Sequence, residues 1–233
     1  MQNKATKKSS TLYCFTPLVS LATFAIEFGL AFYTFAKHRK TLFGKLATIT
    51  LILLGIFQLA EYSICKTGYA ASWTIIGYLA ITFLPALGLH MTSLMTKKST
   101  WTPIGYLVAG ITDLIIIFTP NIFSSSSCPG NFVIFNPLLP VFKIFYSIYY
   151  YVFILIALLM LIKAVSEGDK NKKSAEWMLA GYLSFLLPTF VIYIYEKAAR
   201  VAVPSIMCGF ALLFSIILVL KIIPEFEKLI KEN

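Results

Sequence analysis

Seven apolar stretches, each about as long as a membrane-spanning helix, occupy nearly the whole of this 233-residue chain. They lie near Leu12–Ala36, Leu42–Cys65, Ser72–Met95, Trp101–Thr119, Leu138–Ile162, Ala175–Tyr195 and Val201–Lys221. A bilayer core about 30 Å thick needs about 20 apolar residues per helix. No remaining segment is long enough for a soluble domain. The sequence therefore predicts an all-α, polytopic membrane protein, a bundle of seven transmembrane helices.

Composition supports this class of protein. Hydrophobic residues make up 58% of the chain and charged residues 13%, against about 45–50% and 25% in soluble domains. Mean hydropathy is +0.81. We expect an N-terminal tail over residues 1–11, the transmembrane domain over 12–223 and a tail over 224–233. The first stretch is too long for a signal peptide and contains Glu27, so we expect a permanent helix.

The net charge of +10 does not indicate nucleic-acid binding, because the lysines and arginines lie at the ends of the apolar stretches. Links on one side carry Lys37, Arg39, Lys40, Lys45, Lys97, Lys98, Lys163, Lys170, Lys172, Lys173, Lys221, Lys228 and Lys231. The other side carries Lys4, Lys7, Lys8, Lys66, Lys143, Lys197 and Arg200. The positive-inside rule then places the N-terminus outside and the C-terminus in the cytoplasm, although the three N-terminal lysines oppose it. The expected location is the plasma or cell membrane.

Polar side chains inside the stretches are the candidate ligand-binding residues, because an ionised group within a bilayer is costly unless it is paired or functional. Gln58, Glu61 and Tyr62 share one helical face near the outer end of the second stretch. Glu27 belongs to a polar stripe on the first stretch, and it lies at a depth similar to that of His90. We therefore predict that Glu27 and His90 contact each other. The last candidate is Asp113, a carboxylate near the middle of the fourth stretch.

Cys65 and Cys128 are both expected at the outer side, where a disulfide would hold the long uncharged loop Pro120–Asn136 over the bundle. The alternative is that the four cysteines are free thiols that pack as small hydrophobic side chains. A run of tyrosines over 146–151 could line a pocket, but an aromatic belt with core filling is the simpler interpretation.

The residue inventory argues against several chemistries. The chain has two histidines, too few for a zinc hydrolase with several intramembrane histidines. The interior of the seventh stretch carries no lysine that could form a retinal Schiff base. No phosphate-binding glycine loop, Cys-x-x-Cys pair or Gly-x-Ser-x-Gly elbow occurs. We expect no metal site, no cofactor and no enzymatic activity.

The first third of the chain resembles a group of uncharacterised small membrane proteins from microbes and viruses. Their opening Cys-Phe-Ser-Pro motif, with a later serine, and their Gln-x-x-Glu-Tyr motif match Cys14, Phe15, Pro17, Ser20, Gln58, Glu61 and Tyr62. Thr16 replaces the usual serine and keeps the hydroxyl. The overall layout is also similar to the seven-helix sensor region of some bacterial histidine kinases, here without the kinase. The resemblance implies a fold and a choice of site residues, but no reaction.

The leading hypothesis is a receptor- or sensor-like protein that binds a small ligand in the outer half of the bundle. Gln58, Glu61 and Tyr62 would contact the ligand, and a separate membrane or cytoplasmic partner would receive the signal. One alternative is a proton-coupled transporter or channel that uses Glu27, Asp113 and His90. A second alternative is a lipid-modifying enzyme with Glu61 and His90 as acid and base, although the expected depths of these two residues differ by most of a bilayer. A third is a structural subunit.

Overall fold

The computed structural model describes residues 17–67, 70–98, 100–120, 122–128, 133–137, 139–168, 171–196, 200 and 202–231. Its elements in chain order are α1 (Pro17–His38), α2 (Leu42–Thr67), α3 (Ala70–Thr82), α4 (Leu84–Thr96), α5 (Thr102–Phe118), β1 (Phe123–Ser127), β2 (Ile134–Pro137), α6 (Pro140–Glu167), α7 (Lys172–Tyr195), α8 (Val203–Ile217), the π-helical turn η3 (Leu218–Ile222) and α9 (Ile223–Lys231). In the described chain, six helical stretches are long and apolar enough to cross a membrane, and the shorter apolar helix α5 adds to them.

The prediction of an all-α bundle is therefore confirmed, and six of the seven predicted stretches form helices long and apolar enough to cross a membrane, whereas the fourth forms the shorter helix α5. Apolar length is a local property of the sequence, so the predicted and observed helices agree within a few residues at most ends. The beginning of the first predicted stretch, Leu12–Thr16, lies outside the described residues.

The third stretch is two helices rather than one. The break falls at Phe83, and Pro85 occupies the first turn of α4, because proline has no N–H to continue the backbone ladder. The hydroxyl of Tyr149 donates a hydrogen bond of 2.5 Å to the carbonyl of Thr82. This contact satisfies a carbonyl group at the break and joins α3 to α6. Pro188, in contrast, lies within the continuous helix α7.

The last helix extends beyond its predicted end at Lys221. A π-helical turn continues α8 into α9, so the predicted tail from residue 224 is helical as far as Lys231. α9 is fixed to the rest of the bundle by Glu227, which lies 2.8 Å from the imidazole of His38 and accepts a hydrogen bond of 3.0 Å from Thr41. Glu225 also pairs with Lys173 at 3.3 Å. The end of the chain thus packs against the α1–α2 turn and against α7.

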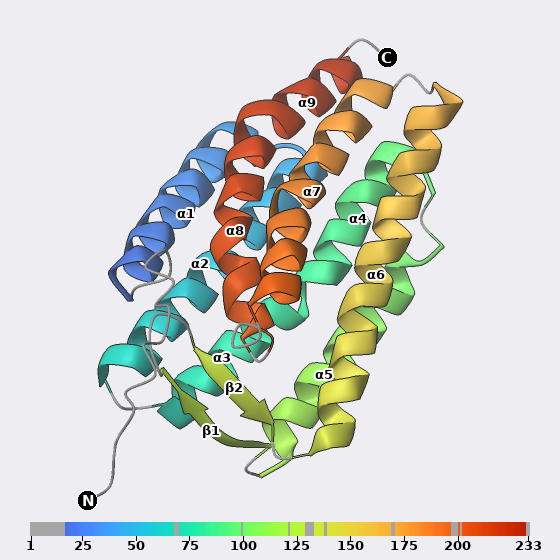
Figure 1. Cartoon of the computed structure of the whole chain (residues 1–233). Helices are drawn as coiled ribbons and strands as arrows, with labels where there is room; N and C mark the ends of the chain where they lie inside the picture. The colour runs from blue at the N-terminus through green and yellow to red at the C-terminus, as the bar shows by residue number, and fades with distance from the viewer. Residues whose placement is uncertain are drawn as a thin grey trace, which may run out of the picture.

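The uncharged loop between α5 and α6 contains an antiparallel hairpin of β1 and β2, which the apolar pattern of the sequence does not predict. A disulfide between Cys65 and Cys128 joins the end of α2 to this loop. The hydroxyls of Thr74 and Ser126 form a hydrogen bond between α3 and β1. Figure 1 shows the hairpin at one end of the bundle and α9 at the opposite end. We call these the hairpin end and the α9 end.

Candidate functional site

The three residues predicted to bind a ligand in α2 do not line a described cavity. Gln58 and Glu61 are 2% and 4% exposed, and Tyr62 is half-buried. Glu61 lies near the hydroxyl of Ser205, at the start of α8. Ser205 also accepts a hydrogen bond of 3.3 Å from the backbone N–H of Val133, beside β2. Glu61 therefore belongs to a packed polar layer between α2 and α8, and Gln58 is buried on the same face of α2, about one turn earlier.

Glu27 belongs to the same layer. It has no exposed surface, and it accepts a hydrogen bond of 3.4 Å from Ser215 of α8. One oxygen of Glu27, one oxygen of Glu61 and the amide nitrogen of Gln58 have no hydrogen-bond partner among the described residues. The buried thiol of Cys208 interacts electrostatically with both glutamates. We call Glu27, Gln58, Glu61, Ser205, Cys208 and Ser215 the α8 polar seam.

The predicted contact between Glu27 and His90 is wrong. His90 lies 3.0 Å from the hydroxyl of Tyr106, and the two rings meet edge to face. His90 therefore faces α5, whereas Glu27 faces α8. Sequence depth alone could not distinguish these faces, because the rotation of each helix about its axis depends on its neighbours.

Asp113 is also separate from Glu27. It is half-buried on α5 near Thr82, whose hydroxyl donates to the carbonyl of Tyr78, and its Oδ1 has no hydrogen-bond partner among the described residues. The enzyme hypothesis required Glu61 and His90 to act together, and the structure gives them different partners, Ser205 and Tyr106. The six predicted residues thus divide into the α8 polar seam, the His90–Tyr106 pair, the Asp113–Thr82 pair and Tyr62.

The largest described cavity is a cleft of about 770 Å³ at the hairpin end. Residues of α3, β2, α6, α7 and the start of α8 line it. In Figure 1, α6 and α7 run side by side along the bundle, and residues of both helices line the cleft. Its volume falls in the range of about 300–1,000 Å³ that is typical of ligand sites. We call it the α6–α7 cleft.

Aromatic rings form the inner wall of the α6–α7 cleft. The ring of Tyr78 packs edge to face against both Phe135 of β2 and Tyr146 of α6, with centroids 5.2 Å apart in each pair. Tyr146 also stacks on Tyr150 one turn further along α6. Such ring pairs are worth about 0.5–1.5 kcal/mol beyond the area they bury. This wall is therefore held in place without a ligand.

Two basic side chains complete the lining of the cleft, Lys143 near the start of α6 and Arg200 between α7 and α8. Arg200 donates hydrogen bonds of 2.9 Å and 3.2 Å to the carbonyls of Tyr193 and Ile194, at the end of α7. Its guanidinium also lies over the ring of Tyr193. The described lining contains no acidic side chain.

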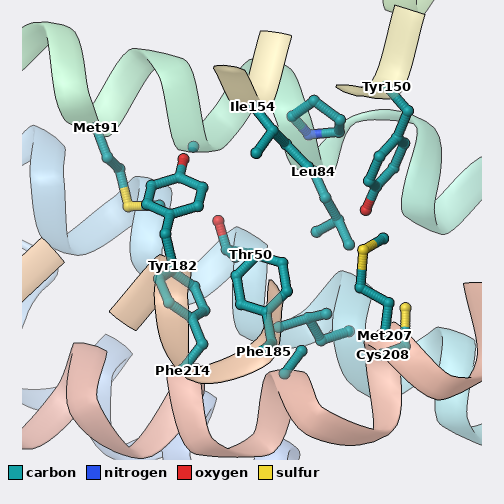
Figure 2. Close-up of a pocket in the computed structure, with 14 residues that line it drawn as sticks. Thr50, Leu84, Met91, Tyr150, Ile154, Tyr182, Phe185, Met207, Cys208 and Phe214 are labelled. Atoms are coloured by element: carbon teal, nitrogen blue, oxygen red, sulfur yellow. The ribbon is translucent and has the colours of Figure 1, made fainter. Parts of the chain in front are cut away.

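A second, smaller cavity of about 50 Å³ lies deeper in the bundle. Figure 2 shows Met91, Tyr182, Phe185 and Phe214 around it, with Tyr150 and Met207 on the far side. Tyr150 and Met207 line both cavities. Cys208 of the α8 polar seam also lines the smaller cavity, so one short segment of α8 contacts the cleft, the small cavity and the seam.

The residues of the α6–α7 cleft are not among the candidates that the sequence indicated. The tyrosine run was the available signal: Tyr146, Tyr150 and Tyr151 do line the cleft. The sequence could not relate Arg200 to α6, because their proximity arises from the packing of α7 and α8. No group of three or more His, Cys, Asp or Glu side chains suited to a metal ion occurs within the described ranges.

No protein-family model matches this chain, and no match was found among the curated proteins compared with it. The function proposed below is therefore argued from the geometry of the chain itself.

Proposed function

We propose that this protein is a receptor- or sensor-like membrane protein, and that its ligand binds in the α6–α7 cleft. The observation that carries the proposal is the cleft itself: about 770 Å³, with an aromatic wall and basic groups at one end. This is the combination of apolar lining and few polar groups that typifies small-molecule sites. The site lies in the half of the bundle where the sequence predicts a ligand, but on different helices.

A change at the cleft can reach the opposite end of the molecule through the last helix. Pro204 and Met207, at the start of α8, line the cleft, and α8 continues through η3 into α9. π-helical turns in α-helices are frequent at functional sites. α9 in turn contacts the α1–α2 turn through His38 and Glu227. With the C-terminus in the cytoplasm, as the positive-inside rule predicts, α9 would present the signal to a separate partner.

The test uses a covalent occupant, so it requires no knowledge of the ligand. Ser147 lines the cleft, whereas the next residue, Ile148, is 60% exposed on the outer surface of α6. A thiol-reactive alkyl reagent is attached to Ser147→Cys, in a background in which Cys14 and Cys208 are replaced by alanine. Ile148→Cys with the same label is the matched control.

Alkylation at position 147 is expected to change amide hydrogen exchange in α9 at least several-fold, because the occupant displaces the start of α8. Alkylation at position 148 is expected to leave α9 unchanged. Equal exchange in α9 for labelled and unlabelled Ser147→Cys would contradict the receptor proposal.

The α8 polar seam favours one second candidate, a proton-coupled carrier. Buried carboxyl groups with unpaired oxygens are typical of proton relays within membranes. Glu27 and Glu61 have such oxygens among the described residues, and both face α8. A carrier would therefore use these two glutamates, because His90 and Asp113 have other partners in other parts of the bundle.

A further inference from the structure

The α6–α7 cleft extends along the bundle axis. Lys143 and Leu158 both line it from α6 and are fifteen residues apart, which corresponds to about 22 Å at a rise of 1.5 Å per residue. The cleft thus extends over more than half of a hydrocarbon core about 30 Å thick. This length suits an extended hydrocarbon chain better than a compact polar molecule.

The wall formed by α7 is open to the surroundings of the bundle. Leu187 and Phe190 both line the cleft and are 55% and 61% exposed. Around a membrane-spanning helix, such surfaces contact lipid. A molecule already dissolved in the bilayer can therefore enter the cleft from the side, between α6 and α7.

The charged side chains that line the cleft are both basic and lie toward its hairpin end. Lys143 lies one turn into α6, and Arg200 follows the end of α7. Neither forms an ion pair with a carboxylate of the described chain, whereas Lys163, at the other end of α6, pairs with Glu167 at 3.5 Å. Arg200 donates its Nε–H and one Nη–H to backbone carbonyls, which leaves further N–H groups of the guanidinium free to bind an anion.

We propose that the occupant of the cleft is one anionic lipid of the surrounding bilayer. Its acidic head group contacts Lys143 and Arg200, and a hydrocarbon chain extends between α6 and α7 toward Leu158. The inference takes its site from the proposed function and adds the chemical class of the ligand. An acidic head group would form charge-assisted hydrogen bonds with both side chains, neither of which has a carboxylate partner in the described chain.

The test compares two lipids that differ in head-group charge and share their acyl chains. The full-length protein in nanodiscs is titrated with phosphatidylglycerol or phosphatidylcholine, and bound lipid is counted by native mass spectrometry. We expect one tightly retained phosphatidylglycerol. Each of Lys143→Gln and Arg200→Gln is expected to lower the protein's preference for phosphatidylglycerol over phosphatidylcholine about fivefold. This is the effect expected of one basic residue near a membrane surface.

Two controls separate charge from structure. Lys163→Gln removes a lysine from the opposite end of the same helix and should leave the preference unchanged. Arg200→Lys keeps the charge and should retain most of the preference, even though the hydrogen bonds at the end of α7 are altered. Lys143→Gln changes no described side-chain hydrogen bond or ion pair, so a loss of folding is not expected there.

Equal retention of the two lipids, or an unchanged preference in both glutamine variants, would overturn the anionic-lipid inference. The alkyl label at position 147 carries no charge, so its effect on α9 is independent of this result. If the label at position 147 changes exchange in α9 but the protein shows no preference between the two lipids, the receptor proposal stands and only the identification of the ligand as an anionic lipid is wrong.

Discussion

At the scale of single residues, Glu27 shows why polar groups within a membrane helix need a tertiary explanation. Its carboxyl has no exposed surface, and Ser215 is the hydrogen-bond partner that the structure gives it. Burying an ionised carboxylate costs several kcal/mol unless good partners compensate for it. The sequence indicated that Glu27 needs a partner, and its depth suggested His90. Helical spacing shows which residues share a face of one helix, but it does not show which neighbouring helix packs against that face.

Glu27→Gln is expected to change the free energy of unfolding by less than about 1 kcal/mol. Glutamine has nearly the same shape, can accept the hydrogen bond from Ser215, and carries no charge into the bundle. Thermal unfolding in lipid bicelles measures this directly. The same stable variant then decides the carrier hypothesis: retention of wild-type pH-driven flux in proteoliposomes would count against proton coupling through Glu27, and loss of flux would support it.

At the scale of elements, the α1–α2 turn depends on a close approach of backbone. A side chain at Gly44 would overlap the carbonyl oxygen of His38, which is a backbone atom and cannot move aside. Thr41 accepts a hydrogen bond of 3.0 Å from the N–H of Gly44 and donates one to Glu227 of α9. The geometry of the turn therefore also positions the contacts that hold α9.

Gly44→Ala is expected to destabilise the protein by about 2 kcal/mol, within the range that overpacking usually costs. Increased hydrogen exchange in α9 should accompany the loss. A Cβ added at Gly29, on α1, would meet no atom within 4 Å, so Gly29→Ala is the matched control and should be neutral or slightly stabilising. Similar unfolding temperatures for the two variants would show that the close approach at Gly44 is not required.

At the scale of the whole molecule, the disulfide joins segments 63 residues apart and ties the hairpin to the end of α2. The hairpin contributes Phe135 to the wall of the α6–α7 cleft, and Phe135 contacts both Phe57 of α2 and Tyr78 of α3. The disulfide therefore ties the hairpin to α2, and the ring contacts of Phe135 tie the hairpin to the wall of the cleft.

Replacing both Cys65 and Cys128 by serine is expected to lower stability by at most about 4 kcal/mol, the chain-entropy value for a loop of this length. Helices that remain in the bilayer after unfolding reduce the loss below that value. We also expect faster exchange in β1 and β2 and weaker retention of lipid in the cleft. A variant that keeps wild-type exchange protection in the hairpin would show that ring packing alone holds it.

The helices could be predicted from the sequence because hydrophobic length and the position of charges are local properties. The sequence thus determined an all-α architecture with helices long and apolar enough to cross a membrane, and it identified the Cys65–Cys128 disulfide as one of two alternatives. The hairpin was missed because its strands are short and are stabilised by disulfide and ring contacts with distant helices.

The tertiary structure decided where the polar faces lie and where the bundle is hollow. Glu27 and Glu61 face α8, while the cleft lies along α6 and α7 beside the hairpin. Helix rotation and crossing arise from contacts between residues far apart in the chain, such as the rings of Tyr78 and Phe135. Periodicity along one helix carries no information about these contacts, which is why the candidate site moved from the polar face of α2 to a cleft lined mainly by α6 and α7.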